Sequence, residues 1–306
     1  MKTLVYHSGA LGDFITILPV LEIWKKYSQS HVVLMGKPEY GILARMSNYI
    51  DEIIDINSRE SLTCFGESEP QKIRELLKVY SDVILFTSEN SPIYINCKKF
   101  FSGRIIRQNP FPSEKVHIID YHYEVIKKWI PVKGTLIPGI TLNSDIVLQN
   151  SKTVAIHPGS GSKRKNWPIE NYYQLAEKIR SRGYTVLWIA GPAEQSDLFP
   201  SQDKICKNVS LPELSIIIKN CLLFIGNDSG ITHLAAAVGC RVVAIFGSSD
   251  PIVWSPRGSN KISILYKKTD CSPCHPSKIL ENPKCNGECF APITSETVFA
   301  VIEEKL

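Results

Sequence analysis

Short apolar runs alternate with segments of helical hydrophobic spacing along most of the chain, and this alternation limits the fold more than any other feature. The first half contains four apolar runs, at residues 3–7, 31–35, 52–56 and 83–87. Between these runs, apolar residues recur every three or four positions over residues 14–27, 39–46 and 71–80. Repeated strand–helix units predict a parallel sheet that helices cover on both faces.

The same alternation begins again after a stretch without a clear period. Proline and glycine punctuate residues 131–151, as in a linker between domains. Strands are then predicted at residues 153–156, 185–190, 222–225 and 241–246, and helices at 171–182, 211–220 and 230–238. The chain has 306 residues, and a typical domain has about 100–200. We therefore predict two doubly wound α/β domains, residues 1–147 and residues 148–306.

Composition excludes several other classes of protein. Hydrophobic residues make up 43% and charged residues 21% of the chain, as in globular domains. No apolar run approaches the roughly 18–20 residues that cross a bilayer, and the N-terminus lacks a signal-peptide core, so we expect a cytoplasmic protein. The net charge of +5 suits phosphorylated small molecules or an anionic membrane surface, and is too small and dispersed for nucleic acid.

The first loop of interest follows the first predicted strand and holds Gly9, Gly12 and Asp13. In doubly wound sheets, ligands bind beyond the carboxyl ends of the strands. The glycines let a ligand approach the backbone, but their spacing is not that of a dinucleotide site. Asp13 lies near the start of the next helix, where two interpretations are open: it is the N-cap of that helix, or a carboxylate placed to act as a general base.

A second loop, residues 157–168, also joins a strand to a helix. It contains Ser160 and Gly161 and then three consecutive cations, Lys163, Arg164 and Lys165. Small residues expose backbone N–H groups, and the hydroxyls and cations add donors and charge for a phosphate or diphosphate. The alternative is a solvated basic turn. We favour phosphate binding because the loop lies at a strand end.

A third loop, residues 226–233, has the same place at the end of a strand. Asp228 is suited to sugar hydroxyls, and Ser229 with the Gly230 N–H is suited to a phosphate oxygen at a helix N-terminus. His233 follows within one turn and either is a satisfied core residue or faces a diphosphate. Glu194, after the intervening strand, either binds ribose hydroxyls or complements the dipole of the next helix.

Five strings, in order and nearly spanning the chain, resemble glycosyltransferase family 9, the ADP-heptose:lipopolysaccharide heptosyltransferase family. They are GALGD at 9–13, HPGSG at 157–161 leading to KNWP at 165–168, GPAE at 191–194, GNDSGITHLAA at 226–236 and VAIFG at 243–247. The resemblance implies a GT-B fold, in which two Rossmann-like doubly wound domains face a central cleft. It also implies an N-terminal acceptor-binding domain, a C-terminal nucleotide-sugar-binding domain, and inverting transfer that requires no metal or other cofactor.

The resemblance also assigns roles to residues. Asp13 would be the general base, framed by Gly9 and Gly12 on the acceptor side. The donor-binding residues would be Ser160, Gly161, Lys165, Ser229 and Gly230 at the diphosphate, Glu194 at the ribose, Leu214 near the adenine, Asp228 at the donor sugar, and His233, which matches the family's histidine.

The implied reaction transfers heptose from ADP-heptose to a lipopolysaccharide-core or related glycolipid or oligosaccharide acceptor. Two alternatives remain: a transferase of the same fold that uses another nucleotide sugar, such as a UDP-sugar, and a non-catalytic nucleotide-sugar-binding protein. A glycolipid acceptor places the protein at the cytoplasmic face of the inner membrane as a peripheral protein. Four cations, Lys98, Lys99, Arg104 and Arg107, either attract that membrane or the acceptor's phosphates or form an ordinary solvated face.

Four of the nine cysteines cluster near the C-terminus, at Cys271, Cys274, Cys285 and Cys289. Their spacing is close to that of a four-thiolate zinc site. Three interpretations are open: a structural zinc ion, labile disulfides, or free thiols in a surface loop. A cytoplasmic location disfavours disulfides, and no interpretation makes the cluster catalytic.

Overall fold

The computed structural model describes residues 1–66, 70–132, 134–142, 152–191, 199–274 and 287–303. The chain divides into two compact units, Met1–Thr141 (unit 1) and Leu142–Leu306 (unit 2). The boundary predicted between residues 147 and 148 lies outside the described residues.

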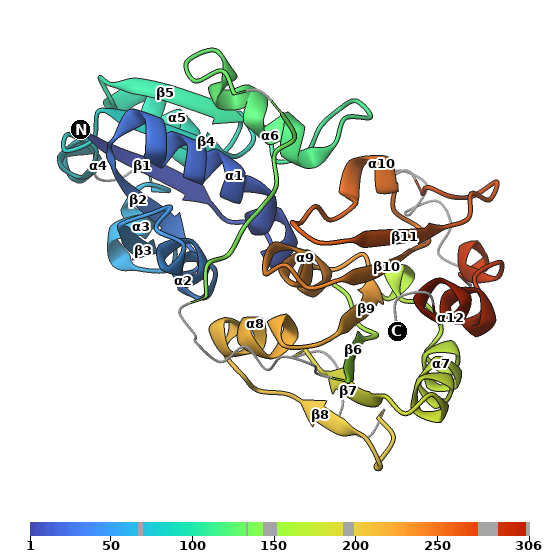
Figure 1. Ribbon diagram of the computed structural model, residues 1–306. Coiled ribbons are helices and arrows are strands. Elements are labelled where there is room, and N and C mark those ends of the chain that lie inside the picture. Colours follow the sequence, from blue (N-terminus) through green and yellow to red (C-terminus); the bar gives the residue numbers. More distant parts are fainter. Residues whose placement is uncertain (67–69, 133, 143–151, 192–198, 275–286, 304–306) are drawn as a thin grey trace. The chain divides into compact units, whose positions relative to one another are not determined.

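Unit 1 contains a five-stranded parallel sheet in the order β3-β2-β1-β4-β5 (Figure 1). Its strands are β1 (Lys2–His7), β2 (His31–Gly36), β3 (Glu52–Asp55), β4 (Asp82–Phe86) and β5 (Arg104–Gln108). The helices described between and after them are α1 (Leu11–Ser28), α2 (Pro38–Met46), α3 (Arg59–Thr63), α4 (Pro70–Leu77), α5 (Pro92–Phe100) and α6 (Ile118–Lys127). Central strands β1 and β4 are almost entirely buried, as their unbroken apolar runs predict.

Helices cover both faces of this sheet. On one face, Leu4 and Tyr6 of β1 pack with Ile73 of α4 and with Ile93 and Cys97 of α5. On the other face, α1 and α6 pack against each other. Alternate side chains of a strand point to opposite faces, so neighbouring residues of β1 serve different layers.

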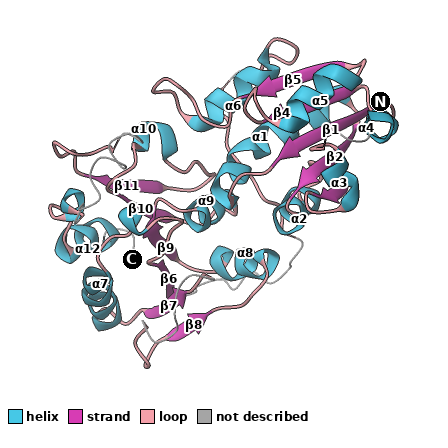
Figure 2. Cartoon of the chain, turned by 180° about the vertical axis from the view of Figure 1, so that it is seen from behind, coloured by secondary structure: helices cyan, strands magenta, loops and turns pink. Residues whose placement is uncertain are grey.

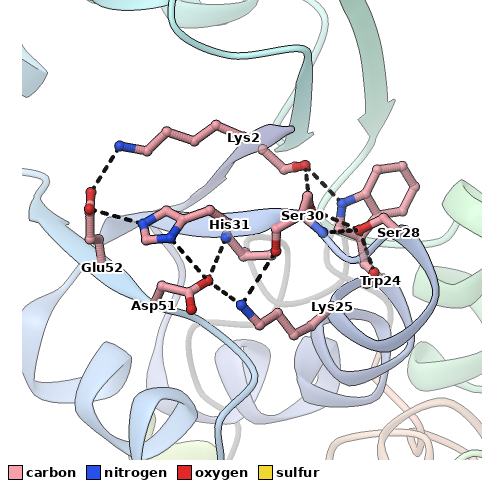
Figure 3. A network of polar contacts seen from close by, with 10 residues as sticks. Lys2, Trp24, Lys25, Ser28, Ser30, His31, Asp51 and Glu52 are labelled. Carbon is pink, nitrogen blue, oxygen red and sulfur yellow. Dashed lines mark hydrogen bonds and ion pairs between the residues drawn. The ribbon is translucent and has the colours of Figure 1, made fainter.

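A network of polar side chains holds the amino-terminal edge of the unit 1 sheet (Figure 3). Asp51 precedes β3, accepts the Val32 N–H at 2.7 Å and forms an ion pair with Lys25 of α1. Glu52 lies 3.1 Å from Lys2 Nζ and 2.9 Å from His31 Nε2. The network therefore joins β1, β2 and β3 where they begin. The strands end at the opposite edge, where the loop before α1, which the sequence analysis singled out, also lies.

Unit 2 contains a six-stranded parallel sheet in the order β11-β10-β9-β6-β7-β8 (Figure 2). Its strands are β6 (Thr153–His157), β7 (Thr185–Ile189), β8 (Lys204–Cys206), β9 (Leu223–Asn227), β10 (Val242–Phe246) and β11 (Ile262–Tyr266). Its described helices are the 3₁₀ helices η1 (Lys163–Lys165) and η3 (Glu288–Phe290) and the α-helices α7 (Ile169–Ser181), α8 (Leu211–Lys219), α9 (Gly230–Ala237), α10 (Pro251–Trp254) and α12 (Ser295–Glu303). The core beneath them includes Trp167, Tyr172 and Trp188.

Both sheets reverse their strand order next to their first strand. Strands β2 and β3 lie on one side of β1, and β4 and β5 on the other; β6 has the same position between β7 and β9. Ligands of open α/β sheets bind at such a switch point, beyond the carboxyl ends of the strands. The predicted α/β fold with two doubly wound sheets is confirmed. Within the described ranges, no helix is both long and apolar enough to span a bilayer.

Candidate functional site

In unit 2, the side chain of Asn227 joins the two loops predicted to bind phosphate. Asn227 ends β9 and is fully buried. Its Oδ1 accepts the Trp167 N–H at 3.0 Å and the Tyr172 hydroxyl at 2.9 Å, and its Nδ2 donates to the Pro158 carbonyl at 2.6 Å. The loop that follows β6 is thereby fixed to the loop that follows β9. Both loops lie at the switch point of the sheet.

Lys165 and Asp228 come from these two loops and form an ion pair. Lys165 Nζ lies 2.7 Å from Asp228 Oδ2. The Asp228 side chain is 6% exposed and the Lys165 side chain 37% exposed. A buried carboxylate needs such a partner, whereas the more exposed ammonium keeps access to a further anion. The sequence analysis predicted that both residues bind the donor, and in the structure the two side chains are in contact.

Ser229 and Gly230 form the start of α9. The Ser229 hydroxyl accepts the Thr232 N–H at 3.3 Å and lies 3.4 Å from His157 Nδ1. Burial lowers the pKa of His157 to about 4, so its ring is neutral at pH 7. His233 lies on the same helix and is also buried, with 5% of its surface exposed. Ser229 thus serves as the N-cap of a helix whose positive end lies at the switch point.

Ser160 and Gly161 differ in what the fold requires of them. The Ser160 hydroxyl oxygen lies 2.6 Å from Asn166 Oδ1 and 2.7 Å from the Ser162 carbonyl oxygen, so the hydroxyl has its hydrogen-bond acceptors within its own loop. Gly161 is exposed, and a Cβ added there would meet nothing within 4 Å. Unit 2 as described therefore gives no steric reason for glycine at 161. Leu214 is buried on α8, and Glu194 lies outside the described residues.

In unit 1, Asp13 lies in the first turn of α1. The helix begins at Leu11 with extended Ala10 as N-cap, so Asp13 is the third helical residue and not the N-cap itself. Its Oδ2 accepts the Ala10 N–H at 3.1 Å. Alanine has no polar side chain to return the bond, so this is one half of a capping box. Gly12 also belongs to this first turn.

Gly9 is packed tightly between Asp13 and His7. A Cβ at Gly9 would lie 3.0 Å from Asp13 Oδ2 and 3.0 Å from His7 Cε1. Burial and the nearby charge of Lys37 lower the pKa of His7 to about 3, so its ring is neutral. A side chain at position 9 would therefore crowd Asp13 and His7, whereas the sequence analysis expected glycine here for the approach of a ligand, which stays a prediction.

Two residues at the end of the neighbouring strand escaped the sequence analysis. Lys37 and Tyr40 follow β2, and the Lys37 ammonium lies 5.2 Å from the centre of the Tyr40 ring. Burial raises the pKa of Tyr40, and the negative charges of Glu39 and Asp13 raise it further. The sequence could have revealed them, because ligands bind beyond the carboxyl ends of the strands. Every loop that follows a strand at the switch point is therefore a candidate binding loop.

The cysteine cluster is described only in part. Cys271 is exposed, Cys274 is half-buried, Cys289 is buried, and Cys285 lies outside the described residues. The Cys274 N–H donates to the Ser248 carbonyl at 2.7 Å, so this segment packs on the loop after β10. In the part of the chain that the structure describes, no three His, Cys, Asp or Glu residues are grouped so as to hold a metal ion. Structural zinc stays a prediction.

A doubly wound sheet with two loops rich in small and hydroxyl residues at its switch point is typical of nucleotide-binding α/β proteins. The structure of E. coli ADP-heptose lipopolysaccharide heptosyltransferase II has the same fold. The superposition covers 100% of this chain and 98% of the heptosyltransferase II chain, with a TM-score of 0.74 and 17% sequence identity.

The sequence profile described as "Glycosyltransferase family 9 (heptosyltransferase)" matches residues 137–284. Together with the relatives below, this match shows that the chain is similar to glycosyltransferase family 9 over residues 137–284. The Campylobacter jejuni lipooligosaccharide heptosyltransferase 2 is 26% identical over 292 residues, which cover 90% of this chain and 89% of that relative. The Escherichia coli lipopolysaccharide heptosyltransferase 3 is 32% identical over 120 residues, but these span only about a third of its length, 35%, and 36% of this chain.

Proposed function

We propose that this protein is an inverting, metal-independent heptosyltransferase that transfers heptose from ADP-heptose to a lipopolysaccharide-core or related glycolipid acceptor. Unit 2 binds the donor and unit 1 binds the acceptor. The observation that carries the proposal is the paired loop system of unit 2, in which Asn227 fixes two loops and Lys165 contacts Asp228 at the switch point. The relatives named heptosyltransferases support the choice of heptose as the sugar.

The groups of unit 2 suit a nucleoside diphosphate. The leaving group gains negative charge as the bond to the sugar breaks, and that charge must be stabilised. The Lys165 ammonium and the N-terminus of α9 supply positive charge at the switch point. When a diphosphate competes for Lys165, the Asp228 carboxylate becomes available to accept hydrogen bonds from hydroxyls of the donor sugar.

The proposed chemistry assigns the base to unit 1. Asp13 takes the proton from the acceptor hydroxyl while the hydroxyl oxygen attacks the anomeric carbon. The bond between that carbon and the diphosphate oxygen breaks, and its electron pair leaves with ADP. Attack opposite the leaving group inverts the configuration. Asp13 suits this role because it is half-buried in the first turn of α1, just after β1, and because the Ala10 N–H holds its Oδ2.

The predicted membrane-facing cations divide into two kinds. Arg104 donates to Asp82 Oδ1 at 2.5 Å, and Arg107 donates to the Thr87 carbonyl at 3.1 Å, so both are engaged within unit 1. Lys98 and Lys99 are exposed on α5 and line, with Tyr94 and other residues, a surface pocket of about 450 Å³. Peripheral contact with the inner membrane at its cytoplasmic face therefore rests on the two lysines.

A nucleotide panel tests the donor. We expect ADP to raise the melting temperature of the protein, with much smaller effects of UDP, GDP and dTDP. Incubation with ADP-heptose and lipopolysaccharide truncated to its inner core is then expected to release ADP and to lengthen the acceptor. A selective response to UDP would support the alternative donor. ADP binding without transfer to any acceptor would support a binding protein, and no response to any nucleotide would overturn the proposal.

A further inference from the structure

A segment close to the C-terminal end of unit 2 contacts the loop at residues 157–168. This segment, residues 287–293 (the C-terminal segment), contains η3 and leads into α12, which packs against α7 (Figure 1). Its side chains Cys289, Phe290 and Ile293 are buried in the core of unit 2, together with Trp167. Trp167 and Ile293 are 126 residues apart along the chain, so only the folded sheet brings them together.

Trp167 is held at two points, by its backbone and by its ring. Its backbone N–H donates to Asn227 Oδ1 at 3.0 Å, and its indole Nε1–H donates to the Ile293 carbonyl at 2.7 Å. The indole ring also meets the Tyr172 ring edge-on, with ring centres 4.8 Å apart. Only 1% of Trp167 is exposed, so this residue supports the loop from inside the unit and is not placed to contact a ligand.

The two fixed points of Trp167 bear on the ion pair of the donor loops. Lys165 lies two residues before Trp167, and Asp228 directly follows Asn227. Because Trp167 is bonded to Asn227, the two chain segments that carry Lys165 and Asp228 are held beside each other. The ammonium and the carboxylate then meet at 2.7 Å. The indole bond to Ile293 fixes Trp167 in turn, and so links this pair to the C-terminal segment.

The C-terminal segment also supports the loop that follows β10. A Cβ on Gly247 would overlap the Phe290 ring, so the ring packs directly on the backbone of this loop, and glycine is needed for that close approach. Phe290 is itself 2% exposed. In the sheet, β9 lies between β10 and β6. The C-terminal segment therefore contacts the loops on both sides of β9, the strand that ends in Asn227.

We propose that Trp167 is a positioning residue of the donor site, through which the C-terminal segment holds Lys165 where a diphosphate binds. This inference rests on the proposed function, because it takes the ligand of unit 2 to be a nucleoside diphosphate. A loop that is fixed before binding loses less conformational entropy when the ligand arrives, and this raises affinity without any new contact. Without the indole bond, the loop samples more positions of Lys165 and binds ADP more weakly.

Trp188 provides a matched control for Trp167. Both side chains are fully buried in the same core, and each donates one hydrogen bond through Nε1, Trp167 to the Ile293 carbonyl and Trp188 to Asp203 Oδ2 at 2.8 Å. Trp188 belongs to β7, outside the donor loops. After Trp188→Phe, Asp203 keeps its ion pair with Arg180. The two Trp→Phe variants therefore lose the same kind of bond at different places.

Calorimetric titration of the full-length protein with ADP tests the inference, at a temperature where circular dichroism shows each variant to be folded. We expect Trp167→Phe to bind ADP about fivefold more weakly than wild type, the ratio that one neutral hydrogen bond is worth. Trp188→Phe is expected to bind ADP as tightly as wild type. Phe290→Leu loosens the C-terminal segment and leaves Trp167 in place, and we expect it to weaken ADP binding as well.

The inference is overturned if Trp167→Phe binds ADP as tightly as wild type. It is also overturned if Trp188→Phe weakens ADP binding by the same factor, because any loosening of the core would then have that effect. Should Trp167→Phe fail to fold, Phe290→Leu decides, and unchanged ADP affinity in that variant overturns the inference. Failure of the wild-type protein to bind ADP is a different result and contradicts the proposed function instead.

Discussion

At the scale of single residues, Asp13 combines a capping contact with a proposed chemical role, and two substitutions separate them. Asn at this position keeps an oxygen for the Ala10 N–H, whereas Ala does not. We expect Asp13→Asn to lower kcat by about 10²–10⁴-fold, the range of general base catalysis. Asp13→Ala should lose the same activity and, in addition, about 1 kcal/mol of stability through the missing hydrogen bond.

Calorimetry with ADP is the control for both Asp13 variants. Unit 2 is unchanged in them, so ADP affinity should match that of wild type. Turnover by Asp13→Asn close to the wild-type rate would show that another group takes the proton.

The Lys165–Asp228 pair predicts coupled effects on stability and donor binding. Lys165→Ala leaves the buried Asp228 carboxylate unpaired, which costs about 1–3 kcal/mol, with the low end expected because Lys165 is itself 37% exposed. ADP affinity should fall roughly tenfold or more through loss of the cation. Both are measurable, by urea unfolding and by calorimetry.

Adding Asp228→Asn to Lys165→Ala distinguishes the two effects. The double variant should recover stability, since no buried charge is left without a partner, but it should not recover ADP affinity. Recovery of ADP binding would mean that Lys165 serves only to neutralise Asp228.

The residues of the site differ in how far the sequence could reveal them. Charge and hydroxyls at strand ends are local features, so the sequence pointed to Asp228, to Ser229 and to the cations at 163–165, whereas Lys165 itself was singled out only by the family resemblance. Asn227 was part of the quoted string, but its role was not visible, because its partners Pro158 and Trp167 are distant in sequence and meet it only in the folded sheet. A buried amide that links two loops is a tertiary feature.

At the scale of elements, burial separates most of the strands that were predicted from those that were not; β3 is the exception, because it lies at a sheet edge and is only partly buried, yet its apolar run was predicted. Strands β1, β4, β9 and β10 are buried almost throughout, so each appears in the sequence as an apolar run. The strands that were not predicted, β5, β8 and β11, lie at sheet edges and are only partly buried. Edge strands face solvent on one side, which removes the continuous apolar signal. Helix α6 was also not predicted from the sequence, because the buried His122 interrupts the apolar spacing of the helix.

The polar network at the amino-terminal edge of unit 1 predicts a loss of stability in acid (Figure 3). Burial tends to raise the pKa of Asp51, but hydrogen bonds from Lys25 and the Val32 N–H outweigh it and hold the pKa below its usual value. Hydrogen bonds from Lys2 and His31 lower the pKa of Glu52. Carboxylates with depressed pKa values stabilise the fold above their unfolded pKa of about 4 and lose this effect as pH falls below it.

Asp51→Asn removes one of these charges and should flatten the acid limb of the stability profile. The expected observation is a smaller loss of unfolding free energy between about pH 5 and pH 2 than in wild type. The exposed pair Lys78–Glu75 provides the control, because Glu75→Gln changes a surface contact of little energetic weight. Equal acid limbs for wild type and Asp51→Asn would show that the network does not titrate on unfolding.

At the scale of the whole molecule, both units bury neutral histidines near their switch points. Burial lowers the pKa of all three rings. The pKa of His122 falls to about 3, with a contribution from His7, and the pKa of His7 falls to about 3, with a contribution from the charge of Lys37. The pKa of His157 falls to about 4 through burial alone. These rings stay neutral in the fold but bind protons in the unfolded chain, whose histidine pKa is about 6.5. The contribution to stability is complete above pH 6.5 and declines below it, at up to about 1.4 kcal/mol per pH unit for each ring.

His122 is the best position to test this effect, because its Nδ1 is buried and has no hydrogen-bond partner among the described residues. His122→Leu removes the titrating ring and leaves no polar atom to satisfy. Between pH 6.5 and pH 5.0, the variant should lose about 2 kcal/mol less unfolding free energy than wild type, as measured by urea denaturation. Between pH 7.5 and pH 9 no histidine titrates, so the difference between the two proteins should stay constant there. If the variant and wild type instead lost the same unfolding free energy between pH 6.5 and pH 5.0, His122 would be protonated in the folded protein. A counter-charge would then have to reach its ring.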